Sequence, residues 1–161
     1  MSESIYVGID PGLTGAVAIL HESGKVEFYD MPVVASTGER TELDVWGIRD
    51  IIERIRDCGK ATVGLEKVHA MPKNGAISGF SMGGSLMAWK MGFACFGIRY
   101  QLVLPARWKK LVMDGRPKEK DVSREVARML YPSTAADLCL KRHHGRADSL
   151  LIAEYMRRTQ P

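Results

Sequence analysis

Two carboxylates each stand at the end of a short apolar run, and the two runs have almost the same pattern. Val-Gly-Ile is followed by Asp10, and Val-Gly-Leu is followed by Glu66. Pro11 lacks the N–H that a central strand needs, and Pro-Gly suits the centre of a type II turn, so the first strand should stop at Asp10. If the two strands are parallel neighbours, both carboxylates lie at the same end of one sheet. Carboxylates that close raise each other's pKa unless a cation lies between them, so the pair predicts a divalent metal site.

A third acid, Asp148, opens an otherwise apolar segment with helical spacing near the C-terminus. His144 precedes it by four residues and shares its helix face if the helix begins early enough. Each residue alone also has an ordinary explanation. An Asp at a strand end can cap a turn, Asp148 can be an acid that the helix dipole favours, and His144 can be a surface residue. The repeated pattern at Asp10 and Glu66 favours the metal site.

The elements that must position these residues follow strand and helix patterns in turn. The expected strands are 4–10, 14–22, 25–31, 61–68 and 99–105, the first three forming an antiparallel meander. A loop is expected at 32–40, and the expected helices are 42–57, 78–97, 120–131 and about 146–158. Strand–helix–strand connections imply parallel crossovers. The order β-β-β-α-β-α-β-α-α is that of a ribonuclease H-like α/β fold, a central five-stranded mixed sheet flanked by helices.

Composition is that of a soluble globular chain. Its 161 residues are 45% hydrophobic and 26% charged, which predicts one domain over 1–161. Three scattered cysteines form no CxxC pair, so we expect neither a disulfide framework nor a zinc cluster, and a reducing compartment. There is no signal-peptide pattern, and Lys90 interrupts the most apolar segment, so we expect no membrane association. A cytoplasmic protein of bacterial or phage origin is expected, or an organelle stroma protein whose transit segment is removed.

Basic charge is concentrated toward the C-terminus. Residues 1–98 carry 9 Lys and Arg against 12 Asp and Glu, whereas residues 99–161 carry 14 against 7. A basic half suits a polyanion such as nucleic acid, although a solvated surface can carry the same charge. The candidate phosphate contacts are Arg107, Lys109, Lys110, Arg116, Lys118, Lys120, Lys141, Arg142, His143 and Arg146. Phosphate contacts would make binding depend on salt.

Four segments together resemble a known family. In chain order, GIDPGLTGA, GLE, KDVSREVARMLYP and KRHHGRADSLLIAEY are similar to segments of the RuvC-type Holliday-junction resolvases. The resemblance runs over nearly the whole chain. It is closer to the histidine-bearing branch that includes the plastid monokaryotic-chloroplast resolvase and its bacterial and phage relatives. GIDPG alone also resembles actin-like sugar kinases and Hsp70-like ATPases, but that architecture needs two such domains and this chain can hold one.

The resemblance implies a metal-dependent endonuclease that resolves four-way DNA junctions by paired symmetric cuts. The four matching positions, Asp10, Glu66, His144 and Asp148, would bind two divalent ions, and oxygen ligands suit Mg²⁺ or Mn²⁺. We expect Asp10 to bridge both ions, and Glu66 and Asp148 to hold one each. His144 would bind an ion or orient the attacking water.

The resemblance also implies further DNA contacts. Residues 69–80 follow Glu66 in a region that enters the junction in this family, which adds Lys73 and Asn74 as candidates. The KDVSR segment resembles the family too, which adds Arg124 and makes Lys120 the first choice among the lysines.

A homodimer is expected because resolution needs two symmetric cuts. The segment 78–97 is the candidate interface, with small residues Ser78, Gly79, Gly83 and Gly84 and large residues Met82, Leu86 and Trp89. Packing of this helix against its own sheet is the alternative.

Two other functions remain open. A less specific nuclease of the same fold would keep the acids without selectivity for junctions. A non-catalytic junction-binding protein would keep the basic surface and the dimer but would not need all four ligand positions. Metal-dependent cleavage separates these possibilities.

Overall fold

The computed structural model describes residues 3–35, 41–68, 75–117 and 120–159. Its central sheet contains β1 (Ser4–Asp10), β2 (Ala16–His21), β3 (Val26–Asp30), β6 (Lys60–Glu66) and β7 (Tyr100–Val103), in the order β3-β2-β1-β6-β7. Strands β1, β2 and β3 pair antiparallel, whereas β6 is parallel to both β1 and β7. The predicted meander and the parallel crossovers are both confirmed.

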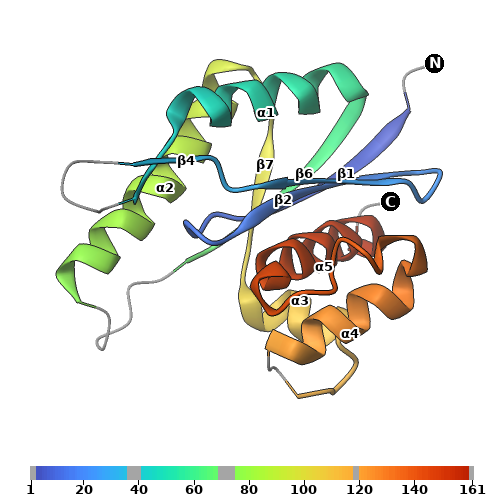
Figure 1. Ribbon diagram of the computed structural model, residues 1–161. Coiled ribbons are helices and arrows are strands. Elements are labelled where there is room, and N and C mark those ends of the chain that lie inside the picture. The colour runs from blue at the N-terminus through green and yellow to red at the C-terminus, as the bar shows by residue number, and fades with distance from the viewer. Residues whose placement is uncertain (1–2, 36–40, 69–74, 118–119, 160–161) are drawn as a thin grey trace.

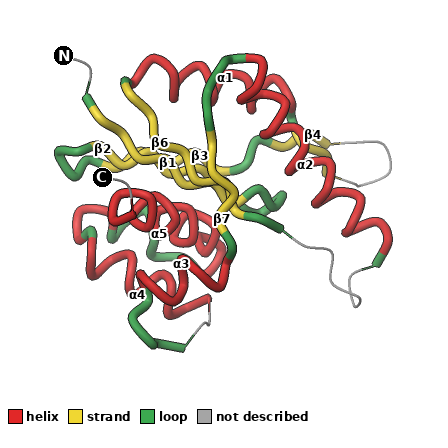
Figure 2. The backbone as a smooth tube through the Cα atoms, turned by 180° about the vertical axis from the view of Figure 1, so that it is seen from behind, coloured by secondary structure: helices red, strands yellow, loops and turns green. Residues whose placement is uncertain are grey.

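Helices cover both faces of this sheet. On one face lie α1 (Val45–Cys58) and α2 (Ala76–Cys95), and on the other lie α3 (Pro105–Val112), α4 (Lys120–Leu130) and α5 (His144–Thr159) (Figures 1 and 2). Two short 3-10 turns, η1 (Pro132–Thr134) and η2 (Lys141–His143), connect α4 to α5. Among the helices of the described residues, none is long and apolar enough to span a bilayer.

Each face of the sheet has its own apolar core. The core beneath α1 and α2 includes Ile5, Val7, Ile9, Ile52, Val63, Leu65, Trp89 and Phe93. The core beneath α3, α4 and α5 includes Ala18, Val103, Trp108, Leu150, Leu151 and Met156. Because side chains alternate along a strand, Gly8 and Asp10 of β1 face the α5 layer, and so do Gly64 and Glu66 of β6.

Gly8 and Gly64 let α5 pack directly on the sheet. A Cβ atom at Gly8 would collide with the backbone of Ser149 and Ala153, and one at Gly64 would collide with the Met156 side chain. Glycine is needed at Gly8, because there the helix backbone itself comes this close to the strand. At Gly64 the space is filled by the flexible Met156 side chain, so α5 lies closest over β1.

Several boundaries differ from the sequence prediction. The predicted loop at 32–40 contains β4 (Val33–Ala35), which pairs with β5 (Thr41–Leu43). The first helix begins at Val45 instead of residue 42, because the Asp44 side chain accepts the Trp46 N–H and caps it.

The sequence prediction lacked α3 altogether. This helix begins at Pro105, where the first position of a helix tolerates proline because its missing N–H is not needed. The last helix begins at His144, two residues earlier than predicted.

Candidate metal centre

Asp10 ends β1, and its carboxylate shapes the turn that follows. Asp10 Oδ1 accepts a hydrogen bond from the Gly12 N–H at 3.1 Å, and the Gly15 N–H donates to the Gly12 carbonyl at 2.8 Å. The hydrogen-bonded turn thus spans Gly12 to Gly15, two residues later than predicted, because the aspartate side chain binds the backbone first. Ser85 of α2 donates a hydrogen bond to the Pro11 carbonyl, so α2 also holds this turn.

Glu66 ends β6 beside Asp10. The parallel register pairs Ile9 with Leu65, so the next residues along the two strands are Asp10 and Glu66, as predicted. Burial, together with the carboxylates of Asp10 and Asp148, raises the pKa of Glu66 to about 7. The three acids are therefore close enough to repel one another, which a bound cation would relieve.

Asp148 reaches the same place from α5. The helix begins early enough for His144 to lie one turn before Asp148 on a shared face. Burial and the Asp10 carboxylate raise the pKa of Asp148 to about 6, against the opposing effects of Lys109, a hydrogen bond from Ser123, and His144. Asp148 Oδ1 is buried and accepts no hydrogen bond from the residues that the structure describes. A buried carboxylate oxygen that lacks a hydrogen-bond donor is a suitable ligand for a cation.

Helix α3 brings two side chains to these acids. The fully buried Trp108 donates a hydrogen bond from Nε1 to Glu66 Oε1 at 2.8 Å. Lys109 lowers the pKa of both Glu66 and Asp148, and its Nζ lies 5.1 Å from the centroid of the Trp108 ring. The sequence suggested Lys109 only as a DNA contact and missed Trp108, although Pro105 after a strand was a signal for a new helix at this end of the sheet.

A cleft of about 780 Å³ opens beside Asp10 and Glu66. Its opposite wall is the first half of α2, and its other lining residues include Leu13, Thr14, Val68, Ile77, Ser78, Ser81 and Met82. The cleft exposes the ends of β1 and β6 to ligands from outside.

The predicted DNA contacts fall into distinct environments. Several of them are exposed basic side chains, namely Arg107, Lys110, Arg116, Lys141 and Arg142, whereas His143 is buried. Lys73, Asn74 and Lys118 lie outside the described residues, and so does the side chain of Lys120.

Two predicted DNA contacts, Arg146 and Arg124, form ion pairs within the chain. Arg146 forms a bidentate ion pair with Asp30, with both N···O distances 2.6 Å, and this pair ties the start of α5 to the end of β3. Arg124 is 9% exposed, pairs with Asp121 and donates to the Cys139 carbonyl. A DNA contact by either arginine would require these interactions to open.

Comparison with solved structures finds the same fold in RuvC. Thermus thermophilus RuvC in complex with a Holliday junction substrate matches with a TM-score of 0.58 and 20% identity, over 97% of this chain and 96% of that chain. A second Thermus thermophilus RuvC structure matches with a TM-score of 0.52 and 18% identity, over 92% and 90%. No protein-family model matches the sequence, and no curated protein is significantly similar to it. The chain thus has the ribonuclease H-like fold of RuvC, with the five-stranded mixed sheet that the sequence predicted.

Proposed function

We propose that this protein is a structure-selective endonuclease that resolves four-way DNA junctions by paired symmetric cuts. The observation that carries the proposal is the convergence of Asp10, Glu66 and Asp148, with a buried Asp148 oxygen that accepts no hydrogen bond within the described part of the chain. The fold shared with a junction-bound RuvC supports it.

The segment H-G-R-A-D, which begins at His144, supports a finer placement. It favours the histidine-bearing branch that includes the plastid resolvase and its bacterial and phage relatives. We accordingly propose that the protein acts in a cytoplasm or an organelle stroma.

The proposed cofactors are two Mg²⁺ or Mn²⁺ ions held by Asp10, Glu66, His144 and Asp148. The donor set fits these ions because three mutually repelling carboxylates supply hard oxygen ligands. Bound there, two divalent ions would stabilise the attacking and leaving oxygens of a phosphodiester.

The remaining residues of the site orient the acids and favour their ionised forms. The Trp108 N–H fixes Glu66, the Gly12 N–H fixes Asp10, and Ser123 lies beside Asp148. Donors from different elements thus pre-position the three carboxylates before substrate arrives.

Basic groups near the acids complete the site. Lys109 favours the ionised forms of Glu66 and Asp148, as its lowering of both pKa values indicates. Lys141 and Arg142 are exposed on the turn that leads directly into His144, where they could contact phosphates that flank the cut.

The outer face of α2 supports a homodimer. Apolar or small exposed residues recur along it at intervals of three and four, at Phe80, Gly84, Met87 and Met91. We name these four residues the α2 stripe. Their spacing is that of the contact seam between two packed helices, and Phe80 is 86% exposed in the single chain. Trp89, which the sequence offered for this interface, is instead buried in the chain's own core.

The test is a cleavage assay with Mg²⁺ on a labelled four-way junction, beside linear duplex and single-stranded DNA of the same sequence. The proteins are the native chain, Asp10→Asn, and Asp57→Asn as a control in an exposed acid at the end of α1. Paired symmetric nicks on the junction alone, lost in Asp10→Asn and kept in Asp57→Asn, would establish the proposal. Cutting of all three substrates would favour the less specific nuclease, and tight junction binding without cutting would favour the non-catalytic protein.

A further inference from the structure

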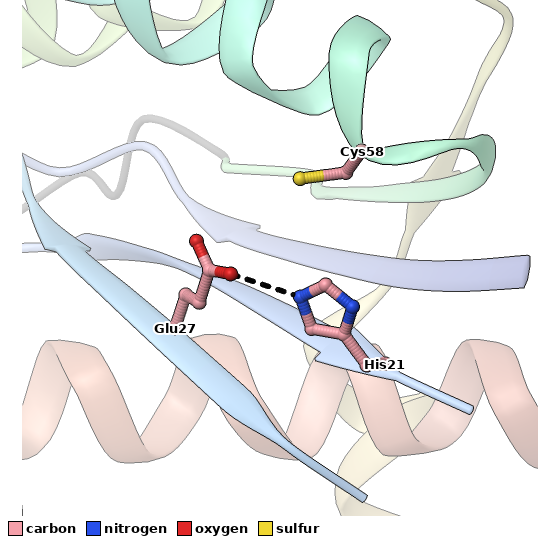
Figure 3. A group of neighbouring side chains, drawn as sticks. All are labelled: His21, Glu27 and Cys58. Atoms are coloured by element: carbon pink, nitrogen blue, oxygen red, sulfur yellow. Dashed lines mark hydrogen bonds and ion pairs between the residues drawn. The ribbon is translucent and has the colours of Figure 1, made fainter. Parts of the chain in front are cut away.

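A second group of metal-ligating side chains lies at the end of the sheet opposite to Asp10. Within the described residues, ligand atoms of His21, Glu27 and Cys58 all lie within 4.8 Å of one another. His21 ends β2, Glu27 lies on β3 and Cys58 ends α1, so three elements supply the group (Figure 3). We name it the His21 cluster. Its members are too scattered in sequence to form a motif, which is why the cysteine spacing predicted no zinc cluster.

We propose that the His21 cluster binds one divalent ion of the Zn²⁺ type. An imidazole nitrogen, a thiolate and a carboxylate oxygen are ligands that Zn²⁺ takes in proteins. The sulfur ligand gives this site a different metal preference from that of the carboxylate centre, whose oxygen-rich donor set suits Mg²⁺. Three protein ligands leave one tetrahedral position for water.

The geometry needs only a small adjustment to admit the ion. His21 Nε2 faces Glu27 Oε1 at 3.0 Å, whereas two ligands on a tetrahedral ion with bonds of 2.0–2.2 Å stand about 3.4 Å apart. Cys58 extends from the end of α1 toward this pair (Figure 3). The required outward shift of His21 and Glu27 is therefore a few tenths of an ångström.

The other nitrogen of His21 is held as metal-binding histidines require. Its Nδ1 lies 3.1 Å from Glu3 Oε2. A carboxylate on the far ring nitrogen fixes the ring and turns the other nitrogen toward the ion. His21 is also buried, so the ring is held in place by its surroundings.

Cations already contact Glu27, and the charge balance still permits the ion. Both ring nitrogens of His21 face carboxylates, Glu3 on one side and Glu27 on the other. These two carboxylates and the Cys58 thiolate would offset the charge of a divalent ion, whose binding displaces the thiol proton. Lys25 and Arg54, which also bond to Glu27, are substantially exposed and can turn into solvent.

Bound metal would tie the β2–β3 hairpin to the end of α1. This is a structural role at the end of the sheet remote from the acids, and it does not depend on the proposed nuclease activity.

The test is a titration of the metal-free full chain with Co²⁺, in excess Mg²⁺ so that the carboxylate centre is occupied. The starting protein carries Cys95→Ser and Cys139→Ser, which removes the two exposed thiols and leaves Cys58. We expect one Co²⁺ per chain with a sulfur-to-cobalt charge-transfer band, and one equivalent of Zn²⁺ should abolish it. Cys58→Ser should remove the band, and His21→Gln should weaken Co²⁺ binding at least tenfold.

Two results would overturn the proposal. One is the absence of the charge-transfer band in the starting protein. The other is a band of unchanged affinity in His21→Gln, because sulfur would then bind cobalt without the cluster. A circular dichroism spectrum of each variant shows whether it is folded. As a second measurement, Zn²⁺ should raise the melting temperature of the starting protein and not that of Cys58→Ser, and an equal rise in both would also contradict the site.

Discussion

Asp148→Asn should stabilise the protein at pH 8 without divalent ions, although it should abolish cleavage. Burial and the Asp10 carboxylate raise the pKa of Asp148 from its ordinary value of 3.8 to about 6. Above pH 6 the folded protein therefore holds a charge that the unfolded chain accommodates more easily. Asparagine keeps the size of the side chain and removes that charge.

The expected gain follows from the shift in the pKa of Asp148. A tenfold change in proton affinity corresponds to about 1.4 kcal/mol, so a rise from 3.8 to about 6 corresponds to about 3 kcal/mol. The lower bound of the gain in unfolding free energy is roughly half of this value, because Glu66 can take up a proton and relieve part of the repulsion. For a chain of this length, 1 kcal/mol moves the melting temperature by about 2–4 °C, so the gain is roughly 3–12 °C.

The sign of the pH dependence is also fixed. A raised pKa in the folded state means that the native protein loses stability as pH rises from 3.8 through 6, and Asp148→Asn does not incur this loss. The difference between the two proteins should therefore be full at pH 8 and should vanish near pH 4.

Thermal melting at pH 4 and pH 8, first with chelator and then with excess Mg²⁺, measures these differences. Mg²⁺ should raise the melting temperature of the native chain at pH 8 much more than that of Asp148→Asn. The control Asp57→Asn removes an exposed carboxylate and should change the melting temperature little. Equal or lower stability of Asp148→Asn at pH 8 would show that burial and repulsion do not act on this carboxyl group as argued.

Three further changes test the positions of other residues. Trp108→Phe removes the hydrogen bond to the Glu66 carboxylate. A hydrogen bond to a charged group contributes about 1.5–3 kcal/mol, so the rate of cleavage at neutral pH should fall roughly 10- to 100-fold. Part of the activity should return above pH 7, because the lost donor raises the pKa of the glutamate, and a pH–rate profile that does not move would contradict this role. Met87→Glu should convert a dimer into a monomer in analytical ultracentrifugation, whereas Met129→Glu on the exposed side of α4 should not. A persistent Met87→Glu dimer would place the interface elsewhere. Gly8→Ala should lower the free energy of unfolding by about 1–3 kcal/mol or more in urea titrations, because its methyl group collides with the α5 backbone, and an unchanged value would contradict the close packing.

The sequence predicted the features that depend on local pattern. The two apolar runs, the strand–helix–strand crossover and the proline after Asp10 were enough to predict two parallel strands that end side by side, so the juxtaposition of Asp10 and Glu66 was predicted from the sequence. Trp108 could not be found in this way, because α3 has only 8 residues and so short a segment shows little periodicity.

Charge counting also had a physical limit. Arg146 was chosen for its charge, but its partner Asp30 lies 116 residues away, and the sequence does not show which cations are already paired. The β4–β5 hairpin was not predicted, because three-residue exposed strands carry no apolar alternation.

Helix α2 has a different task on each of its two sides. The α2 stripe faces outward, whereas buried Ser85 donates a hydrogen bond to the Pro11 carbonyl beside Asp10. In the proposed homodimer, this helix would connect a second copy of the chain to the turn that follows Asp10. Contacts of a partner with the α2 stripe would restrain this helix and, through the Ser85 hydrogen bond, the turn after Asp10. Asp10 would then be held more rigidly in the dimer than in the monomer, so we expect the dimer to be the active form.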